Sequence, residues 1–203
     1  MARPQKTDAE IQAVRERILD TALAILQESG PEALTSRAIA RRLNVAHMYL
    51  FTYFKNQAAI LAALREREMS RWRAQQDCIE RRARFEEISM VVKELLDLYN
   101  DFARQNPNLY RLAWVMPEVG IESLEENRQR MQATVGHLAR LLELGMEHGT
   151  FEPRDPSLAA GVVLGMVNMP HVLFHSGKLI DPRMRDRMVD ESLLAAMAYL
   201  RKK

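Results

Sequence analysis

Apolar residues recur along most of this chain at steps of three and four positions, which is the spacing of amphipathic α-helices. The first such run covers 8–29, where Thr7 or Asp8 can cap the start and Gly30, followed by Pro31, ends the helix. Long β-branched alternations are missing, and glycine and proline number only 8 each in 203 residues. The pattern therefore predicts an all-α fold, with further helices over 37–43, 46–53, from Asn56 onward, and over 85–105, 108–116, 123–148, 155–176 and 181–200.

Asn44 lies between two of these helices, 37–43 and 46–53. A sharp corner between helices usually needs a residue with positive φ, and asparagine tolerates that conformation best after glycine. The arrangement predicts a helix-turn-helix unit, with Thr35 as N-cap of its first helix. The residues expected to point inward are Val45, Leu50 and Phe54. The residues expected on other faces are His47, Met48, Tyr49, Thr52 and Tyr53, with Phe51 at the boundary.

Basic residues dominate the same region. Between Glu32 and Glu66 no acidic residue occurs, although the formal net charge of the whole chain is only +2. The basic residues in this interval are Arg37, Arg41, Arg42, Lys55 and Arg65. Such a local cationic field attracts polyanions, most commonly phosphate backbones. The alternative is a solvated basic face without a partner.

The bulk composition fits a compact protein with two parts. We expect a helix-turn-helix domain over 1–56 and a helical domain over 57–203, whose long first helix acts as a connector. The single cysteine, Cys78, cannot form an internal disulfide, which fits a reducing compartment. No signal-peptide core and no run of about 18 apolar residues is present, so we expect a cytoplasmic protein without a membrane partner.

The N-terminal part resembles the TetR family of transcriptional regulators. The residues that carry the resemblance are Ile18-Leu19, Ala22, Gly30, Thr35, Ile39-Ala40, Val45, Leu50-Phe51, Tyr53-Phe54-Lys55 and Leu61. The resemblance implies a homodimer that places its third helix in the major groove of a double-stranded DNA operator. Mapped onto this chain, it implies that Thr35, Ser36, Arg37, Phe51, Tyr53 and Lys55 hold phosphates, and that His47, Met48 and Tyr49, after Ala46, face base edges. We also expect free backbone N–H groups at the start of the second helix to face a phosphate.

The chain departs from the family pattern at several positions of this unit. The family usually has glycine at Asn44, serine at Ala46, small residues near Met48 and lysine at Gln57. Ala46 forfeits a side-chain cap worth about 1 kcal/mol, and Gln57 forfeits a charged contact. The bulky Met48 and its neighbour Tyr49 indicate an unusual operator preference, unless both pack on neighbouring helices instead.

The second half carries soft and aromatic residues suited to an adaptable apolar cavity, and the resemblance implies a small, hydrophobic effector there. The candidate apolar lining is Trp114, Met116, Met166, Met169 and Phe174, and the candidate polar anchors are Tyr99, Asn168, His171 and His175. The alternative is that these residues are plain core. Pro170 falls inside the helix predicted over 155–176, where it either bends the axis or separates two helices.

No catalytic constellation is apparent. His171 and His175 stand one helical turn apart and could meet one metal ion, but no HExxH pattern and no third ligand accompany them. There is no nucleophile with its base and no glycine-rich phosphate loop. We expect no enzymatic activity, no metal and no cofactor.

Two apolar stripes near the C-terminus could form a four-helix seam between two copies, or could pack within one chain. They comprise Leu158, Ala159, Val162, Val163 and Gly165, and Met188, Leu193, Ala196, Met197 and Leu200. The sequence as a whole favours a homodimeric repressor that binds a palindromic operator and is released by a small, mainly apolar ligand. The alternatives are a constitutive DNA-binding or interaction protein without ligand response and, less favoured, a helical enzyme.

Overall fold

The computed structural model describes residues 7–116 and 124–202. These residues confirm the all-α prediction: within them the only β pairing is an isolated antiparallel bridge between Phe151 and Arg201. The helices are α1 (Asp8–Ser29), α2 (Ser36–Leu43), α3 (His47–Leu50), α4 (Gln57–Arg82), α5 (Ile88–Gln105), α6 (Pro107–Tyr110), α7 (Leu124–Glu147), α8 (Pro156–His175) and α9 (Pro182–Leu200), with a 3₁₀ turn η1 (Pro31–Ala33) and a π-helical turn η2 (Arg111–Val115).

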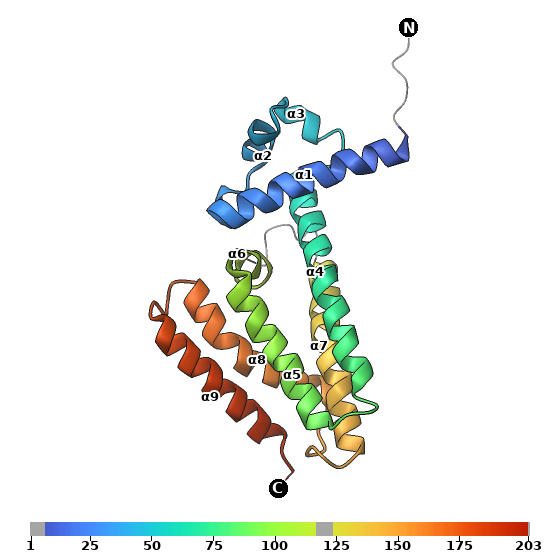
Figure 1. Cartoon of the computed structure of the whole chain (residues 1–203), viewed down its shortest axis with the longest axis vertical. Helices are drawn as coiled ribbons and strands as arrows, with labels where there is room; N and C mark the ends of the chain where they lie inside the picture. Colours follow the sequence, from blue (N-terminus) through green and yellow to red (C-terminus); the bar gives the residue numbers. More distant parts are fainter. Residues whose placement is uncertain (1–6, 117–123, 203) are drawn as a thin grey trace.

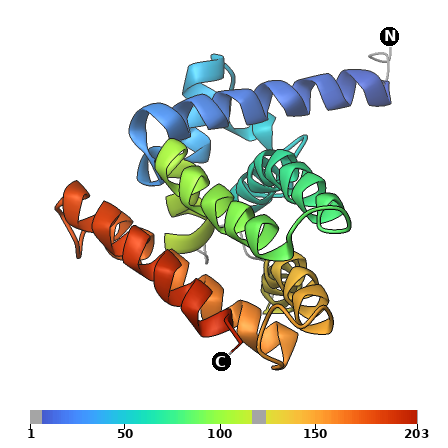
Figure 2. The same cartoon turned by 60° about the horizontal axis from the view of Figure 1, so that its bottom comes forward.

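The helices form a small head and a larger bundle joined by α4 (Figure 1). The head consists of α1, α2 and α3, and α4 runs from it down to the bundle of α5, α7, α8 and α9. α6 and η2 lie directly beneath α1, between the head and the bundle. In the turned view α9 forms the outer edge of the bundle, on the side away from α4 (Figure 2).

Short polar residues cap the starts of five helices, and two of them, Thr7 and Thr35, are among the caps predicted above. Each accepts a hydrogen bond from a backbone N–H of the first turn and so satisfies a donor that the helix leaves free. The capping residues are Thr7, Thr35, Asn56, Asp155 and Asp181. α1 begins and ends where the apolar pattern indicates, because Thr7 and Glu10 form a capping box and Gly30 adopts a φ of 81°.

The third helix is shorter than predicted. The expected helix over 46–53 is regular only in α3, and the chain continues through 51–53 as turns. The amides of Phe51, Thr52 and Tyr53 each bond to the carbonyl three residues earlier, at 3.0–3.2 Å. This tighter, 3₁₀-like bonding replaces the α-helical pattern because the chain must turn again before α4.

The helix predicted over 108–116 is also divided, into α6 and the π-helical turn η2. Pro170, in contrast, lies inside the continuous helix α8, so the alternative of two separate helices there is wrong. Proline has no backbone N–H to donate to the carbonyl one turn earlier, and α8 continues through Pro170 without this hydrogen bond.

Two clusters of buried apolar side chains hold the fold together. The first joins the head to α4, α5 and α6, and its most completely buried members include Ile18, Leu26, Ile39, Leu50, Ile60 and Leu64. The second fills the lower bundle and includes Leu95, Leu96, Leu138, Leu141 and Leu142. Removing a side chain of this size from water stabilises the folded state by about 1.5–3 kcal/mol. The domain boundary at residue 56 stays a prediction, and the first cluster extends across it.

Of the described helices, α8 alone is long and apolar enough to cross a membrane, by length and composition, with a mean hydropathy of 1.6 over its best window. It packs against α5, α7 and α9 within the bundle. Core helices of the same length and composition pass the same test, so this feature is weak evidence for a membrane span.

Candidate nucleic-acid interface and ligand cavity

The turn between α2 and α3 has the predicted geometry. Asn44 adopts φ 54° and ψ 46°, the left-handed conformation, and is the one non-glycine residue with positive φ in the described part of the chain. The amide of Val45 then bonds back to the carbonyl of Ala40 at 3.0 Å. This corner fixes the angle at which α3 leaves α2 and so orients the candidate recognition residues.

Gln57 has a role that the sequence did not reveal. Its side-chain oxygen accepts a hydrogen bond from the backbone N–H of Ser36 at 3.0 Å, and its amide nitrogen donates to the carbonyl of Leu34 at 3.4 Å. Thr35 Oγ1 accepts from the amide of Ala38 at 3.1 Å. Two amides at the start of α2 are therefore already bonded, so the expectation of free N–H groups is wrong for these two.

His47 is held against the start of α2. Its Nε2 lies 2.9 Å from the hydroxyl of Ser36 in a hydrogen bond, and its ring meets that of Phe51 edge-on, with centroids 5.1 Å apart. Ala46 precedes it without a side-chain cap, as expected. The hydrogen bond ties the first turn of α3 to α2, and the ring contact holds His47 against the residue that ends α3.

Met48 is the most exposed apolar side chain of α3, at 70%. The alternative that it packs on neighbouring helices is therefore wrong. Tyr49 is half-buried, and its hydroxyl lies 3.3 Å from that of Tyr53. Tyr53 itself is only 8% exposed, so the expectation that its side chain lies on an outer face is wrong. The reason is that the 3₁₀-like turn rotates Tyr53 towards the core.

The candidate DNA-binding residues thus differ in accessibility. The exposed ones are Thr35, Arg37, Ala46, Met48 and Lys55; the half-buried ones are His47, Tyr49 and Phe51; the buried ones are Ser36 and Tyr53. The structure brings all ten together on α2, α3 and the segment that leads into α4.

Fewer basic side chains of the head are available to a polyanion than the sequence indicates. Arg42 forms a two-pronged ion pair with Glu28, with N–O distances of 2.5 and 2.6 Å, and the guanidinium lowers the pKa of that carboxyl. Arg65 is buried within α4. Besides the ion-paired Arg42, three basic side chains of the interval are exposed: Arg37, Arg41 and Lys55.

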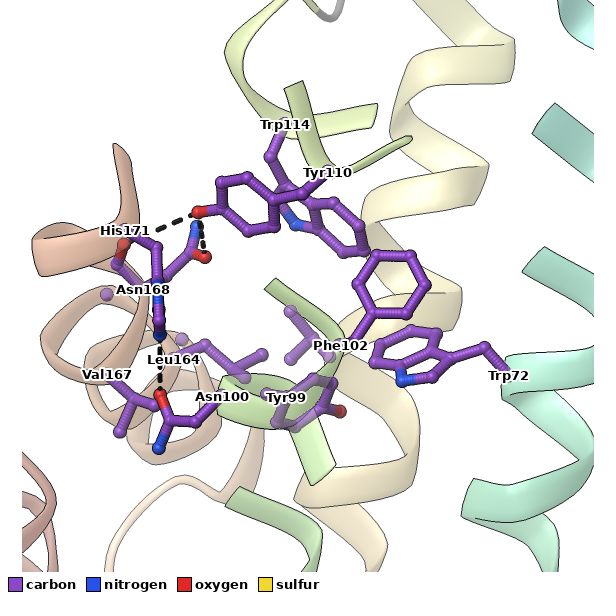
Figure 3. A pocket seen from close by; sticks show the side chains of 13 residues that line it. Trp72, Tyr99, Asn100, Phe102, Tyr110, Trp114, Leu164, Val167, Asn168 and His171 are labelled. Atoms are coloured by element: carbon purple, nitrogen blue, oxygen red, sulfur yellow. Dashed lines mark hydrogen bonds between the residues drawn. The ribbon is translucent and has the colours of Figure 1, made fainter. Parts of the chain in front are cut away.

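A cavity of about 230 Å³ lies between α4, α5, α6, η2, α7 and α8 (Figure 3). Four of the predicted residues line it: Tyr99, Trp114, Asn168 and His171. Five do not: Met116, Met166, Met169, Phe174 and His175. The lining residues that the sequence did not single out are Trp72, Asn100, Phe102, Tyr110, Val135, Gly161, Leu164, Gly165 and Val167.

Aromatic rings form most of one side of this cavity. Trp72 packs against Phe102 and Trp114, with ring centroids 5.3 and 5.7 Å apart. Tyr110 stacks on Trp114 at 5.3 Å and an interplanar angle of 13°. Tyr99 lies 5.0 Å from Trp72 and accepts a hydrogen bond from Gln76 at 3.0 Å. Such offset and edge-on contacts hold the rings in place and leave their remaining faces to the cavity.

The opposite side, formed by α8, carries two polar side chains among apolar ones. Figure 3 shows the hydrogen bonds that cross from α8 to its neighbours: Tyr110 donates to Oδ1 of Asn168 at 2.5 Å, and His171 Nε2 bonds to Oδ1 of Asn100 at 3.0 Å. Burial, followed by the charge of the nearby His175, lowers the pKa of His171 to about 4. His171 is therefore a neutral ring at physiological pH.

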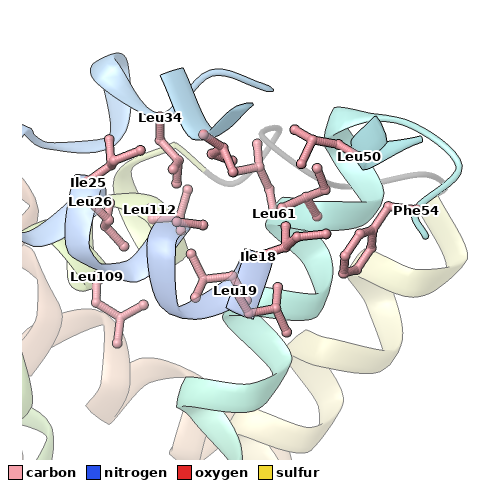
Figure 4. Close-up of a cluster of buried hydrophobic side chains, with 14 of the residues drawn as sticks. Ile18, Leu19, Ile25, Leu26, Leu34, Leu50, Phe54, Leu61, Leu109 and Leu112 are labelled. Atoms are coloured by element: carbon pink, nitrogen blue, oxygen red, sulfur yellow. The ribbon is translucent and has the colours of Figure 1, made fainter. Parts of the chain in front are cut away.

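α6 and η2 connect this cavity to the head. Tyr110 and Trp114 line the cavity, while Leu109 and Leu112 of the same segment belong to the first apolar cluster beneath α1 (Figure 4). Arg111 forms an ion pair with Glu32, at the end of the head. The segment formed by α6 and η2 therefore contacts the cavity through its two aromatic residues and the head through its leucines and its arginine.

Two sequence profiles match the chain. The profile described as "Bacterial regulatory proteins, tetR family" matches residues 18–64, and the profile described as "Tetracyclin repressor-like, C-terminal domain" matches residues 85–190. The second match covers just over half of the chain. The chain belongs to the TetR family.

Curated relatives match over part of the chain. The tetracycline repressor protein class C of Escherichia coli is 46% identical over 52 residues, which are 26% of this chain and 24% of that protein. The HTH-type transcriptional repressor KstR of Mycobacterium tuberculosis is 34% identical over 97 residues, 47% of this chain and 42% of that protein. The chain thus spans less than half the length of these relatives.

Solved structures match over nearly the whole length. SmeT, the repressor of the Stenotrophomonas maltophilia multidrug efflux pump SmeDEF, superposes with a TM-score of 0.70 at 22% identity, over 95% of this chain and 93% of SmeT. A protein of unknown function from Rhodococcus sp. RHA1 gives a TM-score of 0.74 at 21% identity, over 93% and 96% of the two chains. At these identities the likeness concerns the fold alone.

The helices α8 and α9 of this TetR-family chain pack against each other and also carry exposed apolar side chains. Four of the predicted seam residues are fully buried within the chain: Ala159, Val163, Ala196 and Leu200. For these four, the alternative of packing within one chain is correct. Large apolar side chains remain exposed on both helices: Leu158 and Met169 on α8, and Met184 and Leu194 on α9.

One cluster of potential metal ligands occurs among the described residues, away from the cavity: Asp77, Glu80 and His137. Glu80 accepts hydrogen bonds from Arg140 at 2.6 and 2.8 Å and lies 2.7 Å from His137 Nδ1. The arginine lowers the pKa of Glu80 and already satisfies its carboxylate. This cluster ties α4 to α7 as an ion-pair network.

Proposed function

We propose that this TetR-family protein is a homodimeric transcriptional repressor that binds a palindromic DNA operator and is released from it by a small, mainly apolar ligand. The observation that carries the proposal is the exposed side chain of Met48 on α3, on a head that also exposes Arg37, Arg41 and Lys55. The tetracycline repressor, KstR and SmeT are all named repressors, which supports the regulatory role.

The head divides the contacts with DNA into two kinds. Thr35, Arg37 and Lys55 are exposed and polar, which suits them to phosphates, and these contacts fix the register of the head on the duplex. Met48 can only make apolar contacts, for example with thymine methyl groups, whereas the half-buried Tyr49 can also hydrogen-bond to a base edge. His47 and Ser36 support α3 from behind.

The dimer uses the outer face of α8 and α9. Leu158, Met169, Met184 and Leu194 are exposed on these two helices, and a two-fold axis that packs this face on its copy would form a four-helix seam. The two heads would then bind half-sites whose centres lie about 34–36 Å apart or a multiple of that spacing.

The ligand acts through the segment formed by α6 and η2. A ligand in the cavity would contact Tyr110 and Trp114, and a shift of this segment would move Leu109, Leu112 and Arg111 against the head. Release requires only that the ligand bind more tightly to the conformation in which the two heads no longer match the operator.

The alternatives fit less well. A constitutive DNA-binding protein would need no open space in its second half, and the cavity of about 230 Å³ favours ligand response. An enzyme would need paired titratable groups at such a cavity, and the described lining residues contain no carboxylate beside the neutral His171.

Selection of bound duplexes from a random pool tests the proposal. We expect an inverted repeat to be enriched, since a symmetric dimer reads both halves alike. The variant Met48→Ala should change the preferred bases, while Met90→Ala, which removes a similarly exposed methionine from α5, should leave them unchanged. The proposal would be contradicted if the parent selected sequences without a common motif, or if Met48→Ala selected the same sequences as Met90→Ala.

A further inference from the structure

Two buried polar atoms at the cavity wall have no hydrogen-bond partner in the part of the chain that the structure describes. They are Nδ1 of His171 and Nε1 of Trp72, in side chains that are 1% and 5% exposed. Both residues line the cavity. Buried polar groups are nearly always hydrogen-bonded, so two unmet groups on one cavity indicate that a bound molecule completes them.

The hydrogen bond on the other side of His171 decides what its Nδ1 can do. Nε2 lies 3.0 Å from Oδ1 of Asn100, and an amide oxygen only accepts, so Nε2 carries the proton. Nδ1 of the neutral ring is then an acceptor with a free lone pair. The group that it requires from a ligand is an O–H or N–H donor.

The cavity offers no charge to a ligand. Its described lining residues include no lysine, arginine, aspartate or glutamate, and burial keeps His171 uncharged by lowering its pKa to about 4. An anion or a cation that moves from water into this cavity would find no counter-charge there. The free energy of this desolvation is much larger than the free energy that one hydrogen bond contributes. A fatty acid, with its carboxylate, is therefore a poor fit.

The size and shape of the cavity point to flat rings. Trp72, Phe102, Tyr110 and Trp114 hold one another at centroid distances of 5.3–5.7 Å and present ring surfaces to the space. Its volume of about 230 Å³ exceeds the roughly 150 Å³ that is enough to hold a benzene molecule. One substituted ring or two fused rings would fill it.

We propose that this cavity binds a neutral aromatic molecule of one or two rings whose O–H or N–H group donates a hydrogen bond to Nδ1 of His171. The proposal deepens the proposed function by naming the chemical class of the effector. It rests on that function only for the step from binding to release of DNA.

A matched series of small probes tests the proposal on the full chain, by calorimetry without DNA. The probes are 4-propylphenol, which has the donor; 4-propylanisole, in which a methyl group replaces the phenolic hydrogen; 4-propylbenzoate, which is charged; and decanoate, which is charged and aliphatic. We expect the phenol to bind about tenfold more tightly than the anisole, the difference made by one hydrogen bond. The two carboxylates should bind more weakly than either. Both tryptophans of the chain line the cavity, so their fluorescence should change on binding.

Two variants separate the hydrogen bond from general packing. His171→Phe keeps a ring but removes the acceptor, so it should abolish the preference for the phenol over the anisole. His175→Phe is the matched control, because His175 lies one turn further along α8, also has a buried unpartnered nitrogen and does not line the cavity. It should keep the tenfold preference.

The proposal is wrong if a carboxylate binds most tightly, if phenol and anisole bind equally, or if none of the probes binds. The probe series itself gives these answers even when His171→Phe fails to fold. Duplex selection is a separate measurement. Phenol-selective binding without DNA binding would contradict the proposed repressor function and support the ligand class. DNA binding without phenol selectivity would support the repressor function and contradict the ligand class.

Discussion

The head and the cavity region are built from the same kinds of residue but differ in how completely they are filled and bonded. In the head, Gln57 and Thr35 each bond one amide at the start of α2, Asn56 bonds one at the start of α4, and Leu50 closes the core with no exposed surface. Around the cavity, Trp72 and His171 each keep a buried nitrogen without a partner beside open space. This difference fits the proposed function, in which the head keeps its shape on DNA and the cavity region responds to a ligand.

The largest effect should come from the packed part. Leu50→Ala removes a fully buried side chain from the head, so the free energy of unfolding should fall by about 2–5 kcal/mol. Met48→Ala, two residues earlier but 70% exposed, should change it by less than about 0.5 kcal/mol. Denaturant titration of both variants measures the difference. Equal losses would mean that α3 is packed on both faces and does not present Met48.

The cavity region should show a pH dependence of stability that follows from its histidines. Burial lowers the pKa of His171 to about 4 and also lowers that of His175. Between the ordinary value near 6.5 and the folded value, the unfolded chain binds a proton that the folded chain does not, so stability falls as the pH falls. The loss should reach about 3 kcal/mol at pH 4 for His171.

Unfolding free energies of the parent and of His171→Phe between pH 7 and pH 4 check this prediction. The variant should show a smaller slope in this interval, because the contribution of His171 is missing and that of His175 remains. If the slope is the same in both proteins, His171 is not held as a neutral ring, and the assignment of Nδ1 as an acceptor loses its support.

The space around two glycines of the bundle differs: it is filled at Gly145 and open at Gly161. A Cβ at Gly145 would lie 2.3 Å from Cδ2 of Phe151, so Gly145→Ala should destabilise by about 1–3 kcal/mol. A Cβ at Gly161, on the cavity wall, would meet no heavy atom within 4 Å, so Gly161→Ala should stabilise α8 by up to about 1 kcal/mol. Thermal unfolding of both variants gives the sign of each change, and a loss for Gly161→Ala would show that the wall is already occupied.

Local signals predicted most of the fold. α1 was predicted to the residue because its capping box, its apolar spacing and Gly30 all act within a few positions of the chain. Asn44 was predicted for the same reason, since the cost of positive φ is a property of the residue itself. The end of α3 and the burial of Tyr53 were not predicted, because both depend on how the turn meets α1 and α4.

The candidate sites show the same limit. Met48 and Lys55 are exposed as expected, but the contact of Gln57 with Ser36 joins residues 21 positions apart and leaves no local pattern. In the cavity, residue type indicated Trp114 and His171 but not Trp72. Tyr99 and Phe102, three positions apart on α5, could have indicated an aromatic face that meets Trp72 of α4 and Trp114 of η2.

The central claim, that the head binds duplex DNA through its exposed cationic residues, is tested most directly by a salt titration of operator binding. Lys55→Ala should weaken binding to all sequences and lower the slope of log K against log salt concentration by about one for each head that is bound. Lys178→Ala, which removes an exposed lysine from the loop after α8, should leave both affinity and slope unchanged. Identical slopes for the parent and Lys55→Ala would contradict the account.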